Sequence, residues 1–274
     1  MIAELRAALA VARKDLQIAR RYPLQLINEV MQPLYQFLLP SLLLGATFYV
    51  GGRAIGLEAS AGTDDLAGYL FLGTVVAGLV GAAFWEMAFG LKREMDSGTL
   101  EPMWLTPTRP ETTVLGRAIS GLTLSVLASA ILVAVAVLFF GAAIAGALLV
   151  AVPALLLASI SMLGIGYMVA AAVLVMRDPN FMVDATSFTF SSLSGVAFPV
   201  TVLPFFLQPI SYLLPTTYAV DLLRYYALGT RLLLNPALEW GALVAFAGIT
   251  VFLGLRLFLR TEHRMRVLGT TGQH

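Results

Sequence analysis

Few side chains in this 274-residue sequence could take part in catalysis. There is no cysteine, and the two histidines, His263 and His274, both lie near the C-terminus. Thiol chemistry, thiolate metal sites and a buried imidazole relay are therefore excluded, and we expect no metal site. A phosphate-binding loop needs a Gly-Lys pair followed by Ser or Thr, and neither Lys14 nor Lys92 has these neighbours. The sequence predicts no catalytic residue and no ATP site of its own.

Four ionisable residues within or beside apolar segments could serve transport. Glu86 and Asp184 fall near the ends of predicted membrane spans, where such a side chain either marks a transport path or extends to the interface with water. Trp85, beside Glu86, favours the interfacial position. Asp221 and Arg224 are three residues apart and share a helix face. They would form either a gating ion pair or a surface pair worth less than about 1 kcal/mol.

The composition places these residues in a membrane protein. The chain is 59% hydrophobic and 12% charged, and several apolar stretches exceed the ~20 residues that a helix needs to cross a bilayer. We predict an all-α polytopic fold without internal repeats, in which a tight turn at 141–146 separates the third and fourth of six transmembrane helices. Small residues at 161–166 favour close helix packing in lipid. The predicted spans are 30–50, 67–91, 114–140, 146–175, 181–201 and 237–259.

Residues 1–22 form a separate element ahead of the first span. Their apolar residues recur every three or four positions, which predicts an amphipathic helix ended by Pro23. A basic helix of this kind lies on an anionic membrane surface, although it could instead pack on its own protein. We expect this segment to be retained rather than cleaved. The predicted apolar face contains Ile2, Leu5, Leu9, Ala12, Leu16 and Ala19.

The distribution of basic residues predicts the orientation. With six spans, 14 of the 17 lysines and arginines fall on the side of the N-terminus. Because basic loops stay in the cytoplasm, we expect both termini of this multi-pass protein to be cytoplasmic.

A dense polar island, "REMDSGTLEPMW" at 93–104, interrupts the apolar sequence on the predicted cytoplasmic side. Leu100, Met103 and Trp104 share one face of a short predicted helix, which is typical of a docking element. The alternative is a solvated loop whose Trp104 rests among lipid headgroups. Gly98 would allow a turn with positive φ before this helix. The predicted capping and stop residues are Ser97, Thr99 and Pro107.

Two segments resemble type-2 ABC exporter permeases. The island is similar to the first cytoplasmic loop of that family, and 194–229 is similar to its outer signature. Positions matching the loop pattern are Arg93, Glu94, Gly98, Thr99, Leu100, Glu101, Pro107 and Arg109, followed by 115–117. Positions matching the outer signature are Phe198, Pro199, Pro204, Pro215, Tyr218, Asp221 and Arg224.

The resemblance implies a permease domain at 23–274 that pairs with a second permease copy and with two ATPase subunits. ATP and Mg²⁺ would bind to those ATPases, and this chain would need no cofactor. The loop 92–112 would carry the coupling helix, with Arg93, Glu94, Gly98, Thr99, Leu100, Glu101, Met103 and Trp104 meeting the ATPase. The short inner loop 176–180 would sit near the same partner. Residues 202–236, whose prolines prevent a continuous span, would form an outer re-entrant helical hairpin between spans five and six.

The resemblance leaves several cargoes open. Apolar spans favour a small amphiphilic or hydrophobic substrate, such as a drug, an antibiotic or a lipid-like molecule. The alternatives are a lipid-linked oligosaccharide or polysaccharide and, in a different class, an ion-coupled secondary transporter. Membrane lipid is an expected partner, and nucleic acid is not.

Overall fold

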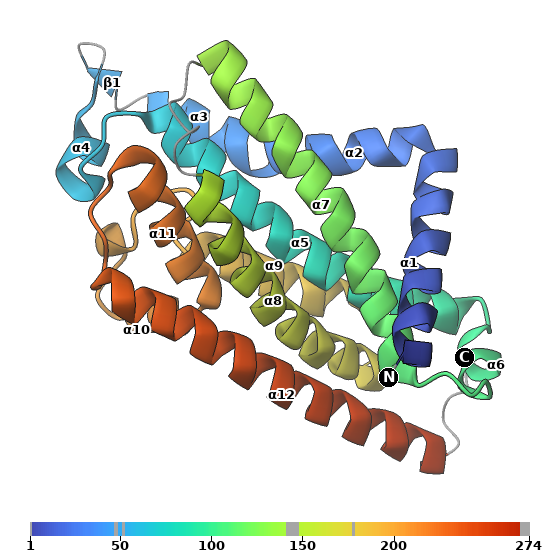
Figure 1. Cartoon of the computed structure of the whole chain (residues 1–274). Coiled ribbons are helices and arrows are strands. Elements are labelled where there is room, and N and C mark those ends of the chain that lie inside the picture. The colour runs from blue at the N-terminus through green and yellow to red at the C-terminus, as the bar shows by residue number, and fades with distance from the viewer. Residues whose placement is uncertain (1, 47–48, 51–52, 141–147, 177–178, 269–274) are drawn as a thin grey trace.

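The computed structural model describes residues 2–46, 49–50, 53–140, 148–176 and 179–268 (Figure 1). These residues are almost entirely helical. The exception is a two-stranded antiparallel pair, β1 (Tyr49–Val50) and β2 (Arg53–Ala54), which is followed by the short helix α4 (Ile55–Ala61). The predicted helical class is therefore confirmed.

Four long helices run side by side through the molecule (Figure 1). They are α5 (Leu66–Asp96), α7 (Pro110–Phe140), α8 (Leu148–Met176) and α12 (Pro236–Leu268). Each contains a stretch long and apolar enough to cross a membrane, namely Leu66–Asp96, Pro110–Val135, Val152–Met176 and Pro236–Val267. Four predicted spans are confirmed as candidate spans, and the turn expected at 141–146 lies outside the described residues.

The other two predicted spans take a different form. The stretch predicted at 30–50 is divided into α2 (Pro23–Pro33), the π-helical turn η1 (Leu34–Leu38) and α3 (Leu39–Ala46). Pro33 and Pro40 lack the backbone N–H that a regular α-helix needs, which accounts for the irregular middle. The stretch predicted at 181–201 is α9 (Pro179–Leu193), whose 15 residues are fewer than the ~20 of a regular span. The described residues therefore give four candidate spans instead of six.

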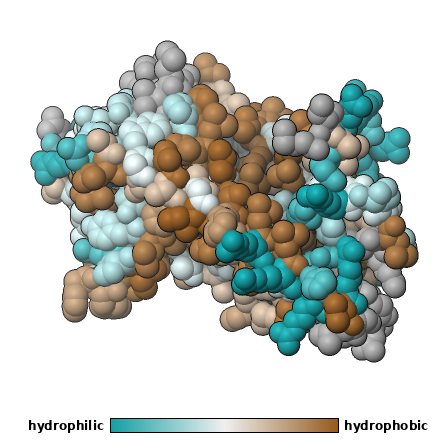
Figure 2. Space-filling model, turned by 60° about the horizontal axis from the view of Figure 1, so that its bottom comes forward, coloured by the Kyte–Doolittle hydropathy of each residue, from teal (hydrophilic) through white to brown (hydrophobic). Residues whose placement is uncertain are grey.

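Further elements lie at the two ends of the helical bundle. One end, called here the α6 end, contains α1 (Ile2–Arg21) and α6 (Leu100–Trp104) together with the last turns of α12 (Figure 1). The opposite end, the α11 end, contains α4, η3 (Val200–Val202), α10 (Gln208–Tyr212) and α11 (Pro215–Leu228). Figure 2 shows hydrophobic residues across the middle of one face, with strongly hydrophilic residues gathered on its right-hand side. This arrangement suits a bundle that crosses a membrane.

Close contact between α8 and α12 confirms the packing predicted from the small residues at 161–166. A Cβ added to Gly164 would lie 2.2 Å from the carbonyl carbon of Thr250, and one added to Gly254 would lie 2.0 Å from the Gly164 oxygen. The Thr250 hydroxyl also donates to the Ser161 carbonyl at 3.0 Å. Small residues thus let the two helix backbones touch, as is common in membrane bundles.

Helix α1 packs against α7 through alanines rather than through leucines. Ala8, Ala12 and Ala19 are buried, and a Cβ on Gly116 of α7 would lie 2.6 Å from the Ala8 carbonyl oxygen. The alternative that α1 packs on its own protein is therefore confirmed for this face, and its position at a membrane surface stays a prediction. The larger apolar side chains exposed on α1 are Leu5, Leu9 and Ile18.

Candidate functional site

The polar island forms a tight turn followed by the short helix α6. Gly98 has φ of +66°, which confirms the predicted turn. The hydroxyls of Ser97 and Thr99, which we expected as caps of α6, donate hydrogen bonds to the end of α5. The Ser97 Oγ donates to the Arg93 carbonyl at 2.8 Å, and the Thr99 hydroxyl donates to the Glu94 carboxylate, so both bond back to the end of α5. The turn is therefore built as a continuation of α5.

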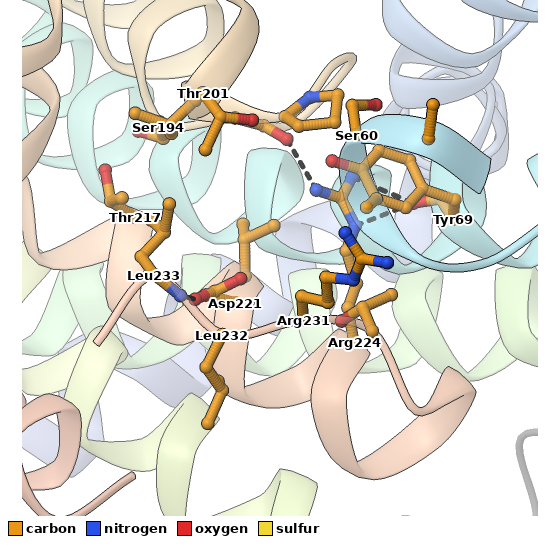
Figure 3. A pocket seen from close by; sticks show the side chains of 17 residues that line it. Ser60, Tyr69, Ser194, Thr201, Thr217, Asp221, Arg224, Arg231, Leu232 and Leu233 are labelled. Carbon is orange, nitrogen blue, oxygen red and sulfur yellow. Dashed lines mark hydrogen bonds between the residues drawn. The ribbon is translucent and has the colours of Figure 1, made fainter. Parts of the chain in front are cut away.

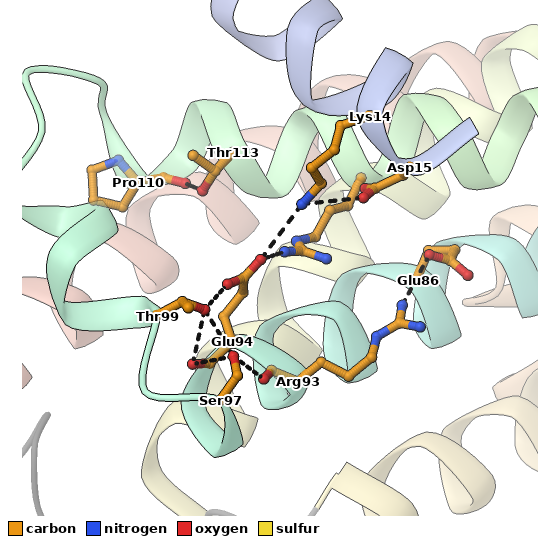
Figure 4. A network of polar contacts seen from close by, with 10 residues as sticks. Lys14, Asp15, Glu86, Arg93, Glu94, Ser97, Thr99, Pro110 and Thr113 are labelled. Carbon is orange, nitrogen blue, oxygen red and sulfur yellow. Dashed lines mark hydrogen bonds and ion pairs between the residues drawn. The ribbon is translucent and has the colours of Figure 1, made fainter. Parts of the chain in front are cut away.

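Glu94 connects three helices at this turn (Figure 4). Its carboxylate accepts hydrogen bonds from Thr99 and from Arg117 of α7, and Lys14 Nζ of α1 lies 3.7 Å from Glu94 Oε1. The Arg117 side chain is only 6% exposed. Gly90 makes room for it, because a Cβ there would lie 2.6 Å from Arg117 Cδ. We predicted that Glu94 would face a partner, but its bonding partners lie within the chain.

Two further ion pairs lie along the same end of α5. Arg93 Nη2 is 3.4 Å from Glu86 Oε2, and Lys92 Nζ is 2.6 Å from Asp96 Oδ1 (Figure 4 shows the first pair). The Glu86 side chain is 22% exposed and pairs with Arg93, and its extension to the interface with water stays a prediction. The Lys92–Asp96 pair, in contrast, is largely in solvent.

The prediction that Leu100 belongs to an exposed docking face of α6 is wrong. Leu100 is 2% exposed and packs with Leu91, Met95 and Val114, and Met103 packs against the same cluster. This burial has a simple reason: α6 lies across the end of the bundle, so its apolar face covers apolar side chains that would otherwise meet water. The side chains of Glu101 and Trp104 are not among those described. Exposed positions around α6 are Pro102, Leu105, Thr106, Pro107 and Arg109.

At the α11 end, Arg224 is buried and points into a ring of backbone carbonyl groups (Figure 3). Its Nη1 donates to the Gly195 oxygen at 2.6 Å, its Nη2 donates to the Val196 oxygen at 2.6 Å, and both Nε and Nη2 donate to the Tyr69 oxygen. The guanidinium carbon also lies 3.3 Å from the centre of the Tyr69 ring. These carbonyls come from α5 and from the chain that leaves α9, so Arg224 ties three segments together.

Asp221 does not form the predicted ion pair with Arg224. Its Oδ2 instead accepts from the Leu233 backbone N–H at 2.7 Å, and Glu239 Oε1 accepts from the Leu234 N–H at 2.9 Å. Burial raises the pKa of the Asp221 carboxyl above its ordinary value. The two acidic residues fix the connection between α11 and α12, whose N–H groups they satisfy.

The other predicted gate residues surround this region. Pro199 lines the 430 Å³ cavity in front of Asp221 and Arg224, and Phe198 lines a second, larger cavity. Pro215 begins α11 at the position where a missing N–H costs least. The Tyr218 hydroxyl donates to the Tyr212 carbonyl at 2.7 Å, and the Pro204 carbonyl accepts from the Leu207 N–H at 2.9 Å. They shape the α11 end, and a gating role stays a prediction.

Sequence reasoning missed Arg117, Lys14 and the glycines that accommodate the two buried arginines. Gly73 receives the second arginine, because a Cβ there would lie 2.1 Å from the Val196 carbonyl oxygen and 2.6 Å from Arg224 Nη2. One signal was visible: Arg117 lies seven residues inside an apolar helix, where a charged residue needs a partner. No sequence pattern indicated which acidic residue that partner would be.

Comparison with known proteins agrees with this architecture. The sequence model of the ABC-2 type transporter family matches residues 6–228, and the chain belongs to that family. It is thus a membrane-embedded transport permease of the ABC class and is not itself an ATPase. Permeases of this family typically work with an ATPase partner. No curated protein gives a significant individual match.

Proposed function

We propose that the chain is the transmembrane subunit of an ATP-driven exporter that moves an amphiphilic or hydrophobic substrate out of the bacterial cytoplasm. Two copies of the permease would pair within the membrane, and two ATPase subunits would bind them from the cytoplasm. The observation that supports coupling is the attachment of α6: buried Leu100 and the Glu94 contacts join this short helix to α5 and α7. A movement imposed on α6 would therefore reach two spans directly.

Within this proposal, the α6 end faces the cytoplasm and the α11 end faces outward. The composite helix α2–η1–α3 has enough residues at 23–46 to cross a bilayer. Helix α9 together with the residues that follow it up to 201 would complete six spans. Helix α1 rests on the inner membrane surface, where exposed Leu5 and Leu9 enter the headgroup region. Helices α10 and α11 form the outer hairpin.

Single cysteines test this orientation, since the chain has none of its own. In intact cells, Ser97→Cys and Thr261→Cys should be protected from a membrane-impermeant maleimide, whereas Ala59→Cys in α4 should be labelled. All three should react after the cells are permeabilised. Labelling of Ser97→Cys in intact cells would overturn the orientation.

Two leucines near α6 test the proposed coupling. Leu105 is 83% exposed beside α6, so Leu105→Ser should leave thermal stability unchanged but weaken co-purification of the ATPase and its stimulation by the permease. Leu100→Ser should lower stability instead, because truncating a buried leucine costs about 2–5 kcal/mol. Melting temperature and ATPase rate should be measured on the reconstituted complex.

The two measurements give distinct outcomes. The permease without its partner should show no ATP hydrolysis, and adding the ATPase should produce it. If Leu105→Ser assembles, stimulates hydrolysis and exports normally, the exposed edge of α6 is not the coupling surface. Robust hydrolysis by the purified chain alone would contradict the whole proposal.

A further inference from the structure

A large cavity lies between α2, α5, α7 and α9 and is separate from the one at Arg224. Its volume is about 880 Å³, which is sufficient for a drug-sized molecule. Each helix contributes residues three or four positions apart, so the cavity runs along the helices. On α7 the lining residues are Gly121, Leu124, Ser125, Ala128, Ser129 and Leu132.

Serine hydroxyls without partners point to a ligand. The Oγ atoms of Ser125, Ser187 and Ser191 are buried and have no hydrogen-bond partner among the described residues, whereas serines on helices often bond the preceding turn. Ser125 is 8% exposed and Ser191 is 5% exposed, so neither residue is freely hydrated. Buried polar groups normally have hydrogen-bond partners. The three unsatisfied hydroxyls, on α7 and α9, therefore form a polar surface that a ligand in the cavity would satisfy.

The same cavity is lined by more negative than positive side chains. Its lining contains the carboxylates of Glu86 and Asp184 and the guanidinium of Arg93. Glu86 and Arg93 pair at 3.4 Å (Figure 4), whereas Asp184 has neither an ion pair nor a hydrogen bond within the described part of the chain. The Asp184 carboxylate is therefore left over at an exposed position on the cavity lining, where it attracts an opposite charge.

Two aromatic rings and a polar stripe on α9 line the cavity together with this carboxylate. Trp85 and Phe89 stack with ring centres 4.5 Å apart and line the cavity, which favours flat apolar groups and cations. On α9, Asp184, Ser187 and Ser191 follow at spacings of three and four, so they form one stripe about 10 Å long. A ligand along this stripe would meet a negative charge at one end and hydroxyls beyond it.

We propose that this cavity binds a lipophilic cation, an organic molecule with a delocalised or ammonium positive charge near Asp184 and polar atoms that the serine hydroxyls contact. The inference rests on the proposed function for naming this molecule as cargo. The binding itself requires neither the ATPase nor export. A test of binding therefore separates failure of this inference from failure of the transport proposal.

The first test uses two oppositely charged probes on the purified permease in detergent micelles. Trp104→Phe and Trp240→Phe leave Trp85 as the only tryptophan, so quenching of Trp85 reports occupancy. Tetraphenylphosphonium should quench it saturably, whereas tetraphenylborate, with the same shape and opposite charge, should not. Asp184→Asn should weaken tetraphenylphosphonium binding at least fivefold. The matched control, Asp64→Asn at an exposed position outside the cavity, should leave it unchanged.

The hydroxyls are tested with a cation that can donate hydrogen bonds. Rhodamine 6G has secondary amine N–H groups, so the double variant Ser187→Ala, Ser191→Ala should weaken its binding several-fold, as followed by fluorescence anisotropy. The same variant should bind tetraphenylphosphonium normally, because that ion has no hydrogen-bonding group. Equal binding of the two oppositely charged probes, or unchanged binding in Asp184→Asn, would overturn the proposal. Altered self-association of Asp184→Asn with unchanged probe binding would overturn it too, since the cavity would then be an interface between copies.

Discussion

Replacing Arg224 with alanine should largely remove folded protein from the membrane. The substitution leaves the carbonyl oxygens of Tyr69, Gly195 and Val196 without their donor in a buried place. Each unsatisfied buried group costs about 1–3 kcal/mol, and a cavity replaces the side chain. A loss of several kcal/mol is a large fraction of the stability of a typical domain. Abundance and melting temperature, measured by fluorescence-detected size exclusion, should both fall.

Two further variants test whether the loss of stability is specific to the Arg224 guanidinium. Arg224→Lys keeps the charge but loses the planar guanidinium that reaches three carbonyls at once, so it should be intermediate. Arg231→Ala changes an exposed arginine that lines the same cavity, and it should behave as wild type. If Arg224→Ala is as stable as Arg231→Ala, the carbonyl ring does not anchor α11.

Reversing the charge of Glu94 should have the second large effect. A lysine there would face Arg117 and Lys14, and Arg117 would lose its carboxylate while only 6% exposed. Removing one partner of a buried pair costs about 3–5 kcal/mol. We therefore expect Glu94→Lys to lower the melting temperature and to abolish stimulation of the ATPase, because α6 and α1 lose their attachment to α5.

A double exchange and an exposed pair provide the controls. Glu94→Arg combined with Arg117→Glu restores opposite charges and should recover part of the lost stability. Asp96→Lys disrupts the exposed Lys92–Asp96 pair of the same helix, and it should cost less than about 1 kcal/mol. Additive effects in the exchange variant, or an equal loss in Asp96→Lys, would show that Glu94 is not a structural link.

The membrane class and most helix positions followed from the sequence, because they depend on local properties. Long apolar stretches predicted α5, α7, α8 and α12, and the glycine at 98 predicted the turn before α6. Small residues at 161–166 likewise predicted the close contact of α8, although not that α12 would be the partner. The island and the outer signature led to the ABC-2 family, which the match over 6–228 confirms.

What a side chain faces was decided only by the tertiary structure. Leu100 has the spacing of a docking face, yet it covers the end of the bundle because apolar side chains of α5 and α7 end there. Asp221 and Arg224 have the spacing of an ion pair along a helix. In the structure, Asp221 instead accepts from the Leu233 backbone N–H, and Arg224 donates to backbone carbonyl groups such as that of Gly195.

The same reason explains the large cavity. Residues of four helices far apart in sequence line it, and their packing leaves Asp184 without an ion pair among the residues that the structure describes. Periodicity along one helix shows which residues share a face, whereas the groups opposite that face depend on the whole arrangement. For this permease, the sequence by itself determined the class and four candidate spans. Packing decided the form of the other two stretches and which charges are paired.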